Sequence, residues 1–239
     1  GSRTWTSIKA NYSNYDAPNN AAMIAWAQDV HDTLLSIGLI LEPTSWAVQW
    51  DFSPQGVPAA NTYTLFKIYE LNDSLSGTLP IFIKIWFGGH PQKGGYYVYD
   101  AHQPQCRVQI GTTVTAGGVL GGILSEPFSV FSITGVGSGS GGGFSTLATQ
   151  NYFHKSNIGL FLFLGGSPGL SVGQYGNPAM MFYLERLPDA NGQPTANGYT
   201  IVRPTENTSV EVSSNGPLSR GALARSYSAA FDLGAWYNN

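Results

Sequence analysis

The chain has 239 residues, a net charge of −3 and a single cysteine, and 10% of its residues are charged while 13% are aromatic. The aromatic content excludes an intrinsically disordered chain, the lack of a basic run argues against nucleic-acid binding, and Cys106 alone cannot form an internal disulfide. The N-terminus lacks the apolar core of a signal peptide, and no apolar run is long enough to span a bilayer. We therefore expect synthesis in a cytoplasm and no membrane partner.

The low charge has two physical explanations. A charged fraction of 10% compares with about 25% in an average soluble domain. Other subunits can cover much of the surface, because interfaces are depleted in charge and enriched in aromatic residues. Alternatively, the chain is a monomer whose surface carries Ser, Thr, Asn and Gln. Composition leaves both explanations open.

The N-terminal region predicts an extended arm followed by a helix. Residues 1–19 are rich in asparagine and form the arm. Residues 20–37 predict the helix, because apolar side chains recur there at steps of three and four. These side chains are Met23, Trp26, Val30, Leu34, Ile37 and Leu41. Asn19 or Asn20 is placed to cap its start, and Gly38 is placed to end it in a left-handed conformation.

After Pro43 the pattern changes to short segments rich in β-branched and aromatic residues, separated by clusters of Gly, Pro, Asn and Asp. The predicted strands are Ser45–Phe52, Tyr63–Leu71, Ile81–Phe87, Cys106–Val114, Phe128–Thr134, Ile158–Leu164, Met180–Leu187, Tyr199–Arg203 and Ser209–Ser214. Their near-regular spacing is typical of antiparallel β proteins. The sequence therefore predicts a mainly β (α+β) fold: an antiparallel β-sandwich or barrel-like body with one N-terminal helix.

The glycine-rich stretch Gly135–Gly143 suggests either an interdomain linker or a phosphate-binding loop. It lacks the lysine and the following helix of a phosphate-binding loop, and it lacks the βαβ unit of a dinucleotide site. Strand-like segments lie on both sides at the ordinary spacing, which favours a long loop within one domain. We expect residues 20–239 to form a single domain that binds no nucleotide cofactor.

A serine-hydrolase interpretation fails on the order of its residues. Gly165–Gly169 has the form G-x-S-x-G, but Ser167 is followed by loop-like sequence, and no histidine occurs after His154. A nucleophile elbow needs a following helix and a downstream histidine. We therefore interpret Ser167 as a turn residue.

The histidines do not predict a metal centre. None of them shows a metal-ligand spacing, and His31 lies at the edge of the apolar stripe of the helix. His90 and His102 could meet Asp100 across a hairpin and form a partial metal or acid–base site, but scattered polar loop residues are the stronger interpretation. We expect no metal and no other cofactor.

Sugar recognition remains an alternative. Glycoside hydrolysis needs paired carboxylates, and no spacing places two of the acids on one face. Aromatic loops can stack on sugar rings, and the loop that carries His90, Tyr96 and Tyr97 is the candidate ligand-facing loop. Such aromatic residues are more often core or subunit contacts.

Three segments in the first half of the chain carry a resemblance to a known class. They are an arm and helix ending in Gly-Leu, a strand–turn–strand with Asn72-Asp73 and Pro80, and a strand and loop rich in Gly and Thr. Their ranges are Asn11–Ile40, Tyr63–Gly88 and Val108–Gly122. Their order resembles virion structural proteins of tailed bacteriophages, of the tail-associated or minor structural kind.

The resemblance implies a building block of a particle, made in the host bacterial cytoplasm, located in the virion and without catalytic residues. Its expected partners are copies of itself and other virion proteins, with a host surface glycan as a further ligand in the alternative of a carbohydrate- or receptor-binding module. A glycan-cleaving enzyme is the least favoured alternative. The candidate intersubunit contacts are the aromatic residues near the two ends of the chain, Trp5, Tyr12, Tyr15, Trp236 and Tyr237.

Overall fold

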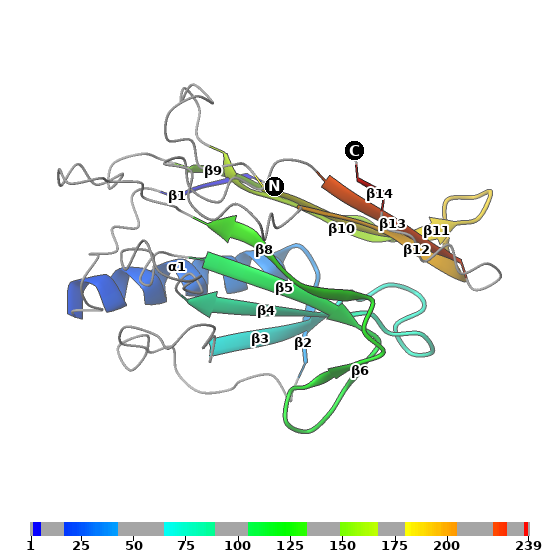
Figure 1. The fold of residues 1–239 in the computed structure, drawn as a ribbon, viewed down its shortest axis with the longest axis horizontal. Coiled ribbons are helices and arrows are strands. Elements are labelled where there is room, and N and C mark those ends of the chain that lie inside the picture. Colours follow the sequence, from blue (N-terminus) through cyan, green and yellow to red (C-terminus); the bar gives the residue numbers. More distant parts are fainter. Residues whose placement is uncertain are drawn as a thin grey trace.

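The structure is a computed structural model, and most of its described residues belong to antiparallel β-sheets (Figure 1). It describes residues 2–5, 17–42, 65–88, 105–132, 149–166, 180–204, 222–228 and 237–238. One α-helix accompanies the sheets in this part of the chain. The predicted mainly β fold with antiparallel sheets and one helix is confirmed.

The larger sheet has seven strands in the order β1-β9-β10-β11-β12-β13-β14, and every neighbouring pair is antiparallel. The strands are β1 (Ser2–Trp5), β9 (Thr149–Lys155), β10 (Gly159–Gly166), β11 (Met180–Pro188), β12 (Pro194–Pro204), β13 (Ala222–Ser228) and β14 (Tyr237–Asn238). The first residues of the predicted arm thus lie at one edge of this sheet, and the last described residues lie at the other.

The smaller sheet has five strands in the order β2-β3-β4-β5-β8, also antiparallel. The strands are β2 (Ile40–Leu41), β3 (Leu65–Glu70), β4 (Phe82–Gly88), β5 (Gln105–Gly111) and β8 (Ser125–Ser132). A small hairpin of β6 (Thr113–Val114) and β7 (Leu120–Gly121) is inserted between β5 and β8. Each predicted strand within the described residues overlaps an observed strand, although the predicted Cys106–Val114 spans both β5 and β6. The predicted strands Ser45–Phe52 and Ser209–Ser214 lie outside the described residues.

The helix α1 spans Ala17–Ser36 and begins earlier than predicted. Pro18 lies in its first turn, where a proline is tolerated because the first amides of a helix have no intrahelical acceptor. The prediction that Asn19 or Asn20 caps the helix is therefore wrong, since both lie inside its first turn. Leu41, predicted as part of the apolar stripe of the helix, belongs to strand β2.

The end of α1 is fixed by Gly38, as predicted. Its φ is 104°, in the left-handed region. The Gly38 amide donates to the Leu35 carbonyl (2.9 Å), and the Leu39 amide donates to the Leu34 carbonyl (3.2 Å). These two bonds form a Schellman motif. Leu34 and Leu39 are the apolar pair that usually accompanies this motif, and both are buried.

We expect Gly38→Ala to lower the free energy of unfolding by about 1 kcal/mol, because a Cβ disfavours the left-handed conformation. Equilibrium urea unfolding measures this change. Gly77→Ala is the matched control: an added Cβ would have nothing within 4 Å, and Gly77 has no left-handed φ. Equal losses in the two variants would contradict this explanation of the helix end.

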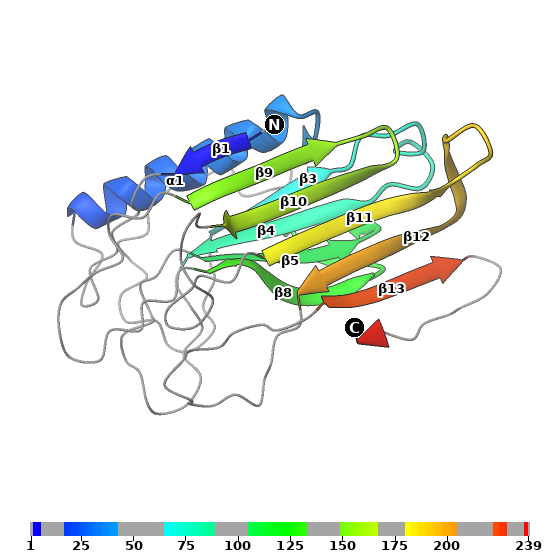
Figure 2. The ribbon, with the colours of Figure 1, turned by 90° about the horizontal axis from the view of Figure 1, so that it is seen from above.

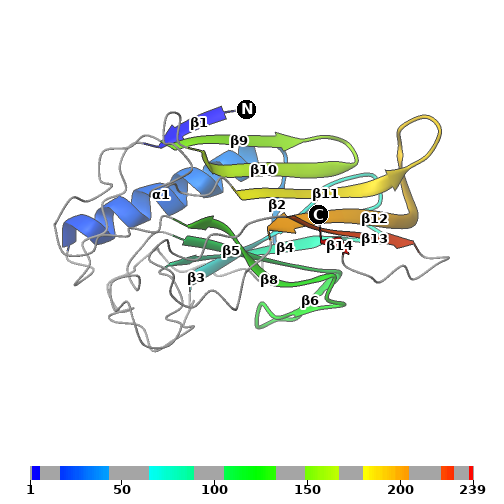
Figure 3. The same ribbon diagram turned by 45° about the horizontal axis from the view of Figure 1, so that its top comes forward.

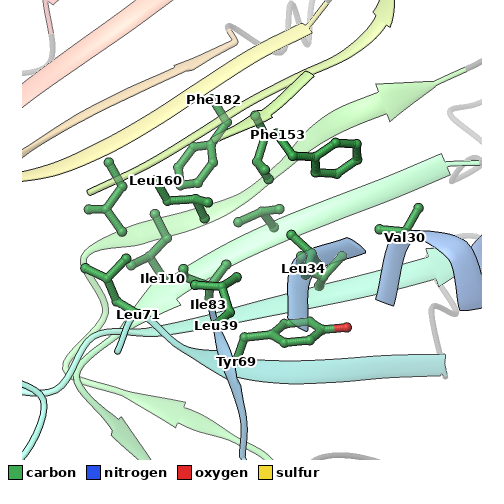
Figure 4. Packing of buried hydrophobic residues seen from close by; sticks show 14 of the residues in the cluster. Val30, Leu34, Leu39, Tyr69, Leu71, Ile83, Ile110, Phe153, Leu160 and Phe182 are labelled. Atoms are coloured by element: carbon green, nitrogen blue, oxygen red, sulfur yellow. The ribbon is translucent and has the colours of Figure 1, made fainter. Parts of the chain in front are cut away.

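The helix and both sheets contribute to one hydrophobic cluster (Figure 4). In Figures 2 and 3, α1 runs alongside the edge of the larger sheet that carries β1 and β9, between the levels of the two sheets. The Trp26 ring meets the Phe87 ring edge-on at 5.7 Å between centres. Residues from each part are almost fully buried: Leu34, Tyr69, Ile83, Ile110, Phe153, Leu160 and Phe182. The faces of the two sheets that carry these residues therefore pack toward each other.

An ion pair also connects the two sheets. The Arg186 guanidinium on β11 donates to the Asp73 carboxylate in the β3–β4 turn and to the Leu79 carbonyl in the same turn. The side chains of Arg186 and Asp73 are 5% and 0% exposed. The other Asp73 carboxylate oxygen accepts a bond from the Leu75 amide (2.9 Å). Asp73 thus shapes its own turn and neutralises the buried arginine of the opposite sheet.

Candidate functional site

A row of residues crosses the larger sheet on the face directed away from the core. Phe161 on β10 is paired in register with His154 on β9 and with Tyr183 on β11. Tyr183 is paired in turn with Val202 on β12. Residues directly opposite each other on neighbouring strands share one face of a sheet. The backbone register continues the row to Ala224 on β13 and Tyr237 on β14.

The burial pattern identifies this face as the outer one. Leu160 and Leu162 are 1% exposed, whereas Phe161 between them is half-buried. His154 is exposed and Tyr152 on the same strand is 42% exposed. In Figure 2, which looks onto this side of the larger sheet, no described helix or strand lies over it. The outer face is therefore broad, aromatic and open toward solvent among the described elements.

One carboxylate accompanies the aromatic side chains. Glu185 lies two residues after Tyr183 on β11, and its backbone partners are Gly159 and Thr200. Burial raises the pKa of Tyr183 to about 12, and the hydrogen bond and the negative charge of Glu185 act in the same direction. The Tyr183 hydroxyl therefore stays protonated at neutral pH and lies close enough to the Glu185 carboxylate to act as a donor to it.

The outer face of the smaller sheet differs because the β6–β7 hairpin covers part of it. The Lys84 ammonium on β4 donates to the Gly118 carbonyl of the hairpin (2.6 Å). It lies 3.8 Å from the ring centre of Phe66 and 4.7 Å from that of Trp86. Burial lowers the pKa of Lys84. The lysine attaches the hairpin to the sheet by a hydrogen bond and cation–π contacts, and it is buried by residues of its own chain.

Gly118 allows this close approach of the hairpin. Its φ is +69°, and an added Cβ would lie 2.7 Å from the Phe66 ring. No larger residue fits without moving the ring. The Lys84 cluster is therefore a closed structural contact, and the outer face of the larger sheet is the better candidate for binding.

A second buried titratable group joins the helix to the smaller sheet. The His31 Nδ1 and the Tyr69 hydroxyl oxygen lie 2.9 Å apart, and Tyr69 is fully buried. Burial lowers the pKa of His31, the positive charge of Lys67 lowers it further, and the negative charge of Asp32 raises it. The neutral imidazole is therefore favoured in the folded protein, as the sequence position of His31 at the edge of the apolar stripe suggests.

The His31 pKa predicts how stability depends on pH. A folded-state pKa below the unfolded value means that the unfolded chain binds more protons, so stability is full above pH about 6.5 and declines as the pH falls below it. We expect His31→Gln to reduce this decline in urea unfolding measured between pH 7.5 and 5. The wild type, measured under the same conditions, is the reference. A slope in the His31 variant equal to that of the wild type would contradict the assignment.

The predicted site residues are only partly within the described residues. Trp5 lies in β1, paired with Thr149, and Tyr237 lies in β14, paired with Ala224. The structure places these two at opposite edges of the larger sheet and does not bring them together. The others lie outside the described residues: Tyr12, Tyr15, Trp236, His90, Tyr96 and Tyr97. Their predicted roles as intersubunit contacts and as a ligand-facing loop stay predictions.

Comparisons with known proteins do not assign this chain to a family. No family model matches it, and no match was found among curated proteins or among solved structures. In the part of the chain that the structure describes, no group of three or more His, Cys, Asp or Glu is arranged to hold a metal ion. Within that part, no helix combines the length and apolar character needed to cross a membrane.

Proposed function

We propose that the chain is a structural subunit of a bacteriophage virion, in the tail or attached to it. It acts by self-association and by docking to other virion proteins, and its body is an antiparallel β-sandwich. The observation that carries the proposal is the open aromatic face of the larger sheet, around Phe161 and Tyr183. A face of this composition suits an interface because interfaces are enriched in aromatic residues and depleted in charge.

The sharing of one core by both sheets and the helix supports this proposal. A subunit that acts by contact needs a surface of fixed shape, and the buried cluster provides rigid support directly beneath the outer face. Phe182 and Leu184, which flank Tyr183 on β11, are fully buried. The low charge of the chain has the same explanation, since residues covered in an assembly need no solvating charges.

The proposal is tested by the assembly state of the purified chain. We expect sedimentation velocity and electron microscopy to detect oligomers of one defined size that persist on dilution into the micromolar range. A chain that remains monomeric at millimolar concentration would contradict the proposed function.

A glycan-binding module is the second candidate, favoured by the same face because aromatic rings beside a carboxylate are a common way to hold a sugar. A glycan array would test it, with a signal that is lost in Tyr183→Ala. A glycan-cleaving enzyme has less support. Among the described side chains of β9, β10, β11 and β12, Glu185 is the only carboxylate, and hydrolysis ordinarily needs two.

A further inference from the structure

We infer that the outer face of the larger sheet binds the same face of a second copy of this chain, about a twofold axis that passes close to Phe161 and Tyr183. The inference rests on the proposed function, because it assigns the self-association of the subunit to a particular surface. Three features of the outer face indicate a second copy as the partner. They are the arrangement of its charges, its aromatic centre and the absence of any described helix or strand over it in Figure 2.

Among the described side chains of the face, one is basic and one is acidic. His154 lies on β9 in the row of Phe161, and Glu185 lies on β11 in the row of Gly159. With about 4.8 Å between strands and about 3.4 Å per residue along them, their Cα atoms lie roughly 12 Å apart. The midpoint between them falls on β10, between Phe161 and Gly159.

A twofold axis in the plane between two facing copies can exchange these two groups. When the axis passes through that midpoint, perpendicular to the line joining His154 and Glu185, each His154 lies opposite Glu185 of the other copy. One isologous contact thus forms two equivalent charge pairs. Glu185 lies on this face because it is two residues from Tyr183 along β11.

The same axis places the aromatic side chains at the centre of the contact. On the strand spacings above, the Cα atoms of Phe161 and Tyr183 each lie within roughly 2 Å of the axis in projection. Each ring therefore meets its own counterpart in the other copy. Gly159, beside the axis, presents no side chain that would hold the copies apart. Aromatic residues at the centre with charged groups around them are the usual anatomy of an interface.

The test uses the charge pair, because a reversal of charge distinguishes a self-complementary face from any other partner. His154→Glu places two carboxylates opposite each other, and Glu185→Lys places a lysine opposite a histidine. We expect each single variant to weaken self-association about tenfold or more, since like charges opposed across an interface are strongly unfavourable. The double variant restores complementary pairs, so we expect it to recover most of the affinity. Sedimentation equilibrium of the full chain at pH 6.5 measures all three.

Two further variants, one at the centre of the face and one away from it, complete the test. Phe161→Lys removes the aromatic centre and is expected to abolish the contact, with folding checked by circular dichroism. Leu79→Lys, at a 45% exposed leucine in the β3–β4 turn, is the control away from the face and is expected to leave association unchanged. If the wild type assembles and the His154, Glu185 and Phe161 variants assemble with the same affinity, this inference is overturned and the proposed function stands. A monomeric wild type would overturn both.

Discussion

Replacing Asp73 with asparagine is expected to lower the free energy of unfolding by about 3–5 kcal/mol, because it leaves a buried arginine without its counter-charge. Asparagine retains the side-chain oxygen that accepts the Leu75 amide, so the turn keeps its local hydrogen bond. The lost interaction is the one with Arg186, whose side chain is 5% exposed. The change therefore reports on the contact between the β3–β4 turn and the opposite sheet.

Equilibrium urea unfolding at pH 7 measures this loss, and Asp189→Asn is its matched control. Asp189 also accepts backbone amides in a turn, from Asn191 and Gln193 (both 2.8 Å), but it is exposed. We expect the control to change stability by no more than about 0.5 kcal/mol. Similar losses of unfolding free energy in both variants would contradict a stabilising role for the Asp73–Arg186 ion pair.

Phe153→Ala is expected to destabilise the protein by about 3–5 kcal/mol, the usual result of removing a large buried aromatic side chain. Phe153 is 1% exposed on β9 and belongs to the cluster that α1 and both sheets share (Figure 4). Truncation leaves a cavity where these three parts meet. A loss of this size requires the larger sheet to pack on the rest of the protein, as the proposed sandwich does.

The neighbouring residue provides the control for this variant. Tyr152 precedes Phe153 on β9, points to the opposite face and is 42% exposed. We expect Tyr152→Ala to cost at most about 1 kcal/mol in urea unfolding. If the loss for Phe153→Ala were no larger than this, Phe153 would not be part of a shared core.

The helix and the hydrophobic strands were predictable because their signals are local. The apolar period of the helix and the glycine at its end identified α1, and alternation or apolar runs identified strands such as β4, β10 and β11. Strand β9 was missed because Gln150, Asn151 and His154 dilute its apolar pattern. Strand β1 has four residues, and it is a strand only through its pairing with β9, far along the chain.

The candidate site was not predictable from single segments. Alternation does indicate that Phe161 and Tyr183 face away from their buried neighbours, but it does not say which residues of other strands stand beside them. The row from His154 to Val202 exists only because of the register of three strand pairs, and register depends on packing and turn geometry. The Asp73–Arg186 pair joins residues 113 positions apart, with no local pattern to indicate it.

The most direct test of self-association through the outer face is chemical cross-linking at the proposed axis. Val202→Cys in a Cys106→Ser background leaves Phe161, Tyr183 and the charge pair in place. On the strand spacings above it puts one thiol on each copy roughly 6 Å from the axis in projection, where a bismaleimide can join two copies. We expect rapid formation of a covalent dimer. Asn191→Cys, exposed in the β11–β12 turn, should form little dimer under the same conditions. Dimer formation at Val202→Cys no faster than at Asn191→Cys would contradict the face-to-face contact.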